Sequence, residues 1–380
     1  MSTRRTIRLA TRGSDLARRQ AASVRERLET RRIEVELREV ETTGDRIRDE
    51  LIHRLGKTGA FVRSLDQEVL DGTVDGAVHS MKDMPTDSPS DLVVAGIPER
   101  APAGDVLVTP DGRAIEDLDP GSIVGTSSLR RKAQLHVARP DLSVEPLRGN
   151  VDTRIEKLLA PTLQAEHERL LDGEADDDER ERGEEEERGN EEERGDEEDD
   201  PVDAWFDGLA EIERRALERR PDTAYDAIVL AAAGLDRAGL AGRVGTHDLP
   251  RSSFVPAPGQ GAIAVTAMEG SEASELIHDG IDHPRTRVET TAERLVLSEL
   301  GGGCVAPIGV HAVVRGEHVH VEAAVFDGEG ERQVTGTRDL PVGEYLEAAR
   351  EFAADLRERG AAGLIEEARV DTEQREAKRE

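Results

Sequence analysis

Short apolar runs alternate with amphipathic helical patterns over the first 160 residues. Residues 7–10 form an apolar segment, residues 15–29 carry apolar positions at helical spacing, and residues 33–40 alternate with a period of two. Further strands are expected at residues 76–78, 92–95, 122–125, 142–147 and 227–230, and further helices at residues 128–138 and 151–159. Repeated strand–turn–helix units predict parallel sheets covered by helices on both faces.

The pattern changes in the last 95 residues. A helical segment at residues 286–300 precedes three short segments that resemble strands, at residues 310–314, 318–325 and 332–337. Their glycine-containing turns predict an antiparallel meander, and residues 344–369 predict one or two closing helices. This part is therefore expected to be a separate α+β domain.

An acidic segment interrupts the α/β pattern between about residues 160 and 223. Residues 172–200 contain 19 acidic residues and 4 arginines, a net charge of −15 within a total of −31. Such a run buries too little apolar area to fold, so it predicts a disordered surface loop. The flank at residues 202–219 has helical periodicity and is expected to dock as a helix. Recruitment of a partner by the acidic loop is the alternative to a solvated insert.

Charge and composition exclude several classes of function. A net charge of −31 argues against general binding of nucleic acid, because phosphates would be repelled. Five lysines among 51 basic residues and an acidic surface suit a halophilic cytoplasm, where salt screens self-repulsion. No stretch has the roughly 18 apolar residues of a membrane span, and no signal peptide is evident. An intracellular protein without membrane association is expected.

Arginine recurs where an expected strand passes into an expected helix. Arg12 precedes Ser14, Arg130 and Arg131 follow Thr126 and Ser128, and Arg148 and Arg154 flank a third such turn. In an open α/β sheet these turns gather at the carboxyl ends of the strands, where helix N-termini offer N–H groups to anions. Arginine adds paired donors that match carboxylates. An anionic ligand with several carboxylate or phosphate groups is predicted.

Two further segments carry candidate chemistry. Lys82 and Asp83 follow an expected strand, and a carboxylate fixed among cations could stabilise a developing positive charge or pass a proton to an amine leaving group. Cys304 is the single cysteine and stands in a glycine-rich turn, where it can carry a covalent group instead of a disulfide. A small buried side chain is its ordinary alternative. No metal-binding motif is present.

Seven segments occur in one order and together resemble the porphobilinogen deaminases, also called hydroxymethylbilane synthases. The resemblance covers the whole chain except the acidic insert and the termini. The segments are ATRGS from Ala10, HSMKDMP from His79, GSIVGTSSLRR from Gly121, LRGNVDTR from Leu147, AAAGLDR from Ala231, PGQGA from Pro258 and GGGCVAPIG from Gly301.

The resemblance implies a three-domain fold. Two doubly wound α/β domains similar to those of periplasmic binding proteins would enclose a cleft, and a small α+β domain would follow. Domain 1 is expected at residues 1–99 and 258–280, domain 2 at residues 103–255 with the insertion at about 160–223, and domain 3 at residues 284–380. Hinges are expected near residues 99–101 and 255–257, since a growing product must move past one catalytic group.

The resemblance also implies the chemistry. Four porphobilinogen units would be joined head to tail, with loss of ammonia, on a dipyrromethane cofactor held by Cys304 through a thioether. Asp83 matches the catalytic aspartate of the family. The residues that match those holding the acetate and propionate groups are Arg12, Ser14, Lys82, Thr126, Ser128, Arg130, Arg131, Arg148 and Arg154. A cytoplasmic monomer is expected.

The sequence departs from the family pattern at one further place. Lys57 lies one residue earlier than a lysine that the family often has before a glycine, so its role stays open. A non-catalytic, two-lobed binding protein for polycarboxylates is the alternative function, because hinged lobes lined with arginines would also serve that purpose.

Overall fold

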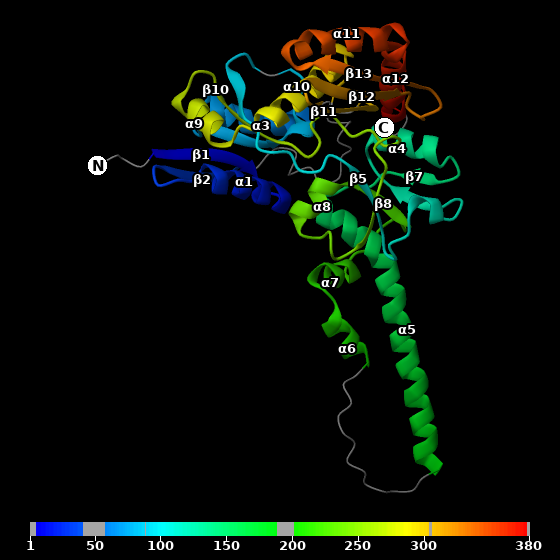
Figure 1. The fold of residues 1–380 in the computed structure, drawn as a ribbon. Coiled ribbons are helices and arrows are strands. Elements are labelled where there is room, and N and C mark those ends of the chain that lie inside the picture. Colours follow the sequence, from blue (N-terminus) through cyan, green and yellow to red (C-terminus); the bar gives the residue numbers. More distant parts are fainter. Residues whose placement is uncertain (1–4, 41–57, 88, 188–200, 304–305, 378–380) are drawn as a thin grey trace.

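The computed structural model describes residues 5–40, 58–87, 89–187, 201–303 and 306–377. Side chains are not described at residues 58–63, 173–187, 201 and 371–377. Three separate sheets organise the described part of the chain, and Figure 1 shows the helices packed around them.

The first sheet has the strand order β2-β1-β3-β10-β4. β1 pairs in parallel with β2 and β3, whereas β10 runs antiparallel to both β3 and β4. Alternate side chains of β1 and β10 enter a core with α1 and α9, and Leu9, Val24 and Val265 are completely buried there. The elements are β1 Arg5–Arg12, α1 Asp15–Leu28, β2 Ile33–Val40, α3 Thr58–Leu70, β3 Gly76–Ser80, β4 Leu92–Gly96, β10 Ile263–Met268 and α9 Glu272–Ile281.

The second sheet repeats this plan, with the order β7-β6-β8-β5-β9. β6 is parallel to β7 and β8, and β5 is antiparallel to β8 and β9. Both sheets are thus mixed, whereas strand–helix alternation predicts parallel sheets. The antiparallel strand of each sheet, β10 in the first and β5 in the second, comes directly after a segment that crosses from the other sheet. The elements are β5 Asp105–Thr109, β6 Ile123–Gly125, α4 Leu129–Ala138, β7 Ser143–Glu145, α5 Val151–Glu187, α6 Pro201–Gly208, α7 Glu211–Leu217, β8 Ala227–Ala231, α8 Ala232–Ala238 and β9 Gly245–Asp248.

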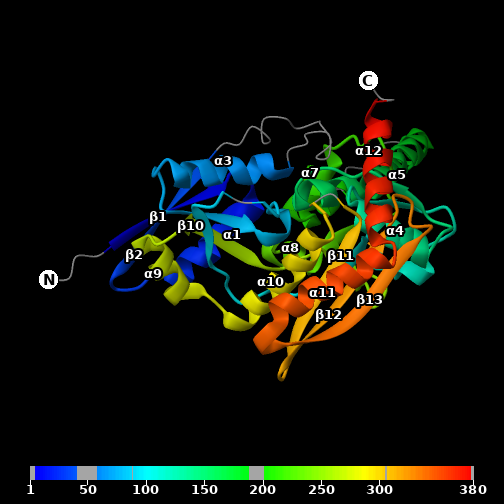
Figure 2. The same ribbon diagram turned by 90° about the horizontal axis from the view of Figure 1, so that it is seen from above.

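The C-terminal part is a three-stranded antiparallel meander with helices against it, which confirms the expected α+β character. Val310, Val321 and Leu340 of the sheet pack against Val296 and Phe352 of the helices. Figure 2 shows α11 lying along β12 and β13, and α12 rising beside them. The elements are α10 Pro284–Glu299, β11 Ile308–Arg315, β12 His318–Phe326, β13 Gln333–Pro341, α11 Tyr345–Glu358 and α12 Ala361–Ala377.

The chain crosses between the first and second sheets twice. Residues 97–104 connect β4 to β5, and residues 249–262 connect β9 back to β10. Gly261 shows how closely the crossings approach each other, since a Cβ there would lie 2.4 Å from the carbonyl oxygen of Ala101. Glycine is required at this contact because any larger residue would force the two segments apart.

The expectation of a disordered insertion was wrong for the part that the structure describes. α5 runs from Val151 to Glu187, and α6 and α7 return along it, as Figure 1 shows below the two sheets. Such a composition predicts disorder only for a segment that must form a core of its own. The base of α5 is instead packed through Ile155 and Leu158, so later residues extend an existing helix without a new nucleation cost. The flank docks as expected, but as two helices, α6 and α7, instead of one; Ile212 and Ala216 of α7 are buried in the same core.

Candidate active site

The Lys82–Asp83 pair lies in a short 3-10 turn, Met81–Asp83, directly after β3. Met81 and Met84 on either side are buried, whereas Lys82 is half-buried and Asp83 is exposed. Arg294 of α10 donates to the carbonyl oxygens of Met81 and Met84 at 3.3 and 3.2 Å. Two buried methionines and the hydrogen bonds from α10 therefore hold the turn in place, with Asp83 exposed and Lys82 half-buried beside it.

Serine residues begin two helices at the carboxyl ends of strands, as the sequence predicts. Ser14 caps α1 by accepting a hydrogen bond from Ala17 N at 3.3 Å, and Ser128 caps α4 by accepting one from Arg131 N at 3.4 Å. Thr126 is buried and its hydroxyl accepts from Ser128 N at 3.2 Å. These hydroxyls fix the helix starts that follow β1 and β6.

The charges of Asp83, of Arg131 in α4 and of Arg154 in α5 act on Lys82, although the two helices belong to the second sheet and Lys82 follows a strand of the first. Burial lowers the pKa of Lys82 to about 8; the charges of Arg131 and Arg154 add to this effect, and Asp83 opposes it. Burial also lowers the pKa of Arg154 to about 10, again with a contribution from Arg131. With Arg130 and Asp105 included, four cations meet two carboxylates, so the cluster carries excess positive charge.

Asp105 at the start of β5 binds both arginines of the RR pair. Arg131 Nη2 donates to Asp105 Oδ1 at 2.7 Å, and Arg130 Nη1 lies 2.9 Å from Asp105 Oδ2. Burial acts to raise the pKa of Asp105, but the two guanidinium groups outweigh it and hold that pKa well below its usual range. Gln260 also donates to Asp105 Oδ1, at 2.9 Å. The sequence does not reveal this partner, because a single aspartate that begins an unpredicted strand gives no motif signal.

The other predicted site residues fall into two groups. Arg12 ends β1, Arg148 follows β7, and Arg154 Nε donates to Gly149 O at 2.8 Å in the first turn of α5. Cys304 and Lys57 lie outside the residues that the structure describes. Gly302, two residues before Cys304, packs closely against Ile308 and Leu297, whose side chains would have to move to admit a Cβ there.

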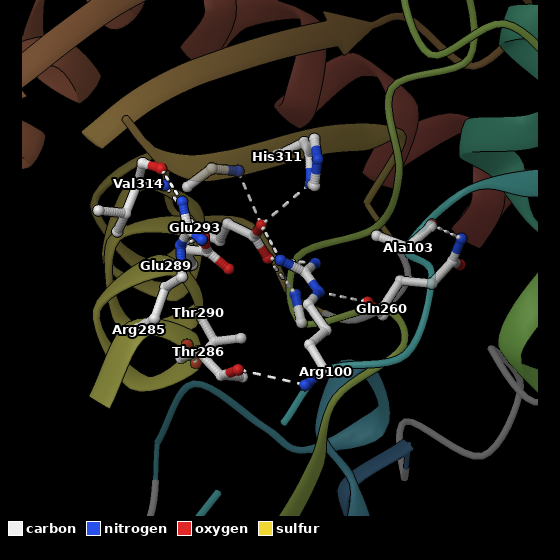
Figure 3. A network of polar contacts seen from close by, with 12 residues as sticks. Arg100, Ala103, Gln260, Arg285, Thr286, Glu289, Thr290, Glu293, His311 and Val314 are labelled. Carbon is white, nitrogen blue, oxygen red and sulfur yellow. Dashed lines mark hydrogen bonds and ion pairs between the residues drawn. The ribbon is translucent and has the colours of Figure 1, made fainter. Parts of the chain in front are cut away.

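A second polar network joins the crossings to the C-terminal part (Figure 3). Arg100 Nη1 and Nη2 donate to the two carboxylate oxygens of the fully buried Glu293 at 2.7 and 2.9 Å. Gly259 N and Ala312 N donate to the same carboxylate at 2.7 and 2.8 Å. Burial acts to raise the pKa of Glu293, but Arg100 and His311 outweigh it and lower that pKa. One carboxylate thus links both crossings to β11.

A family profile described as "Porphobilinogen deaminase, dipyromethane cofactor binding domain" matches residues 7–166 and 210–275. The chain belongs to the porphobilinogen deaminase family. The profile "Porphobilinogen deaminase, C-terminal domain" matches residues 288–358. Residues 167–209 lie between the matched ranges and include most of the acidic insertion.

Relatives of this porphobilinogen deaminase family member match over nearly their whole length. A "Probable porphobilinogen deaminase" of Halobacterium salinarum is 54% identical and covers 96% of this chain and 98% of its own. The "Porphobilinogen deaminase" of Syntrophomonas wolfei is 34% identical, with coverage of 96% and 99%. Among solved structures, the methionine-binding protein MetQ matches with a TM-score of 0.36 at 10% identity, covering 76% of this chain and 94% of its own.

Proposed function

We propose that this protein is a hydroxymethylbilane synthase that joins four porphobilinogen units head to tail and releases ammonia. Family membership supports this activity, and it favours a catalyst over the alternative of a polycarboxylate-binding protein. The observation in the structure that carries the proposal is the joint cluster of Lys82, Asp83, Arg131 and Arg154. Excess positive charge beside one exposed carboxylate suits a substrate that bears two carboxylates and an amine.

The family's dipyrromethane cofactor is itself a polycarboxylate, and the chemistry of this cluster fits it. When bound, the cofactor supplies the primer to which substrate units are added. Lys82, Arg131 and Arg154 would hold its acetate and propionate groups, because an anion relieves the repulsion and desolvation that lower the pKa values of Lys82 and Arg154. Cys304 would carry the thioether. Arg12, Ser14, Thr126, Ser128, Arg130 and Arg148 complete the proposed binding set.

Asp83 is the proposed catalytic residue. Its carboxylate is exposed at the end of a buried turn, where it can contact the substrate. It would stabilise the positive charge that develops on the pyrrole as ammonia leaves, and it would hold the proton exchanged at the leaving amine. Met81 and Met84 keep the turn fixed, so the carboxylate needs little rearrangement during the reaction.

The proposed setting is a monomer in a halophilic cytoplasm that does not bind nucleic acid. The net charge of −31 and the small number of lysines support this setting, because a strongly acidic surface repels phosphates and tolerates high salt. In the part of the chain that the structure describes, no helix combines the length and apolar character that crossing a membrane requires.

Intact mass and turnover test the proposed function together. We expect purified protein to carry the mass of two pyrrole units, and Cys304→Ala to lack it. Asp83→Asn should retain the added mass and lose at least about 100-fold in porphobilinogen turnover, the scale for one electrostatic or proton-transfer group. Asp87→Asn, an exposed neighbour, is the matched control and should stay within twofold of wild type. An adduct on Cys304→Ala, or turnover by Asp83→Asn within threefold of wild type, would contradict the assignment.

A further inference from the structure

A pocket of about 350 Å³ lies where α1, the first crossing and α8 meet. Arg19 and Arg27 line it from α1, Glu99 and Arg100 from the crossing, and Arg237 from α8. Figure 1 shows α1 of the first sheet reaching α8 of the second, and the two helices are in contact. Arg27 lies 13 residues beyond the helix cap Ser14, about 20 Å along the axis. Arg27 and the proposed binding residue Ser14 therefore stand at opposite ends of α1.

Three of the four arginines that line this pocket form no ion pair with an acidic residue in the part of the chain that the structure describes. Among the residues that the structure describes, Arg27 forms no ion pair or hydrogen bond, and Arg19 donates only to the carbonyl oxygen of Arg237, at 3.4 Å. Arg237 Nη2 donates to Gly261 O at 2.7 Å. Glu99 is the carboxylate in the lining, and within the described chain it pairs with none of them. Three guanidinium groups thus share a pocket in a protein whose net charge is −31.

Arg237 is half-buried in this pocket, whereas Arg19 and Arg27 are exposed. Burial lowers the pKa of Arg237, and the nearby charge of Arg27 lowers it further against the attraction of Asp236. Arg100, the fourth arginine of the lining, is already bound to Glu293 and to the carbonyl oxygen of Gln260. Repulsion between like charges is relieved when a ligand of opposite charge enters.

We propose that this pocket binds a small multivalent oxyanion, phosphate or a polycarboxylate, through Arg19, Arg27 and Arg237. Guanidinium groups offer paired N–H donors in a plane, which match oxygen pairs on a carboxylate or phosphate better than a single spherical ion. The volume is at the lower end of the roughly 300–1,000 Å³ of small-molecule sites. The bound anion would join α1 of the first sheet to α8 of the second beside the crossing, and so stabilise one arrangement of the two.

Calorimetric titration of the holoenzyme with inorganic phosphate, citrate and acetate at constant ionic strength tests this site. We expect phosphate or citrate, and not acetate, to bind with one site per chain. Arg27→Gln and Arg237→Gln should weaken that binding at least tenfold, as expected for the loss of one charge-assisted contact. The relative affinities of phosphate and citrate identify which oxyanion the pocket prefers.

Two controls separate the pocket from the proposed active site. Arg31→Gln removes an exposed arginine just beyond α1, and Arg154→Gln changes the catalytic cluster; neither should alter the affinity of the anion. Turnover of Arg27→Gln without added anion should stay within twofold of wild type, which also shows that the variant is folded. The proposal is overturned if neither phosphate nor citrate binds, or if Arg27→Gln binds the anion as tightly as Arg31→Gln does. It is also overturned if Arg154→Gln abolishes binding of the anion.

Discussion

Lys82 illustrates how a motif residue acquires its chemistry from distant parts of the chain. Asp83 is its neighbour in sequence, whereas Arg131 and Arg154 reach it from the second sheet. Its pKa of about 8, against a usual value of 10.5, follows first from burial and then from those two cations. A lysine that titrates close to neutral pH holds an anionic ligand in a way that depends on pH.

Ligand binding at this site should take up protons above pH 8. In Cys304→Ala protein without the cofactor, Lys82 is increasingly neutral as pH rises through about 8, and a bound dicarboxylate restores its charge. Affinity for succinate should therefore fall between pH 8 and 10. Titration calorimetry in two buffers of different ionisation enthalpy measures the uptake, which Lys82→Met should reduce and Lys132→Met should leave unchanged. Identical uptake in both variants would contradict the role of Lys82.

The same lowered pKa has a consequence for stability. Between pH 8 and 10.5 the unfolded state binds more protons at Lys82 than the folded state does. This residue therefore contributes a free energy of unfolding that rises with pH across that window and is lost as pH falls towards 8.

At the scale of elements, α5 shows that an acidic sequence can be helical. His167 of α5 and Trp205 of α6 stack with ring centroids 5.7 Å apart, so the two sides of the insertion are close together where it leaves the second sheet. The buried contacts of Leu158, Ile212 and Ala216 all lie outside residues 172–200. The insertion is thus attached through a packed base that does not depend on its acidic middle.

Replacing residues 172–200 by a four-residue glycine–serine linker should leave turnover within twofold of wild type. The base keeps its apolar contacts, and the proposed site residues all lie outside the deleted segment. Turnover assays and thermal unfolding measure the effect. Trp205→Ala, which removes a stacked ring from the base, should lower Tm more than the deletion does. Loss of activity on deletion alone would instead assign the acidic segment a part in assembly or catalysis.

At the scale of the whole molecule, Glu293 connects the two crossings between the first and second sheets to β11 of the third sheet. Its carboxylate binds Arg100 of the first crossing, Gly259 of the second and Ala312 of β11. Figure 3 shows Arg100 and His311 pointing toward it. Both crossings are therefore hydrogen-bonded to the same helix, α10, through this one side chain. Movement between the first and second sheets must therefore occur around, or by rearranging, this carboxylate.

Glu293→Gln should destabilise the protein by about 3 kcal/mol, because it leaves the buried charge of Arg100 without its partner. The matched control Glu299→Gln lies at the end of the same helix in a solvent-exposed ion pair with Arg350, and it should cost less than about 1 kcal/mol. Thermal unfolding measures both variants, and hydrogen exchange at the crossings locates the change. Equal stability of the two variants would exclude this role for Glu293.

Much of the fold was predictable from local pattern. The strand at residues 33–40 agrees with β2 in both bounds, and the helix expected at residues 15–29 agrees with α1 to within one residue. β5, β9 and β10 were not predicted from the sequence. These strands are short or polar in part, and their pairing partners are distant, so periodicity gives little signal.

The sequence predicted which residues belong to the candidate site. It did not predict which of them contact one another. Arg130 and Arg131 stood out beside Ser128, but nothing in the sequence indicates that Asp105 binds both of them. The assignment of Cys304 as the cofactor anchor stays a prediction, because it lies outside the described residues.

The sequence by itself determined many of the helices and strands, β1 to β3 and α1 among them, because periodicity and turn residues act over a few neighbouring positions. It also determined the family, since seven ordered motifs need no structure to be compared. Only the tertiary structure decided which charges meet: Lys82 with Arg154, Arg131 with Asp105, and Arg100 with Glu293. Electrostatic interactions depend on distance and burial in three dimensions, and neither can be read from spacing along the chain.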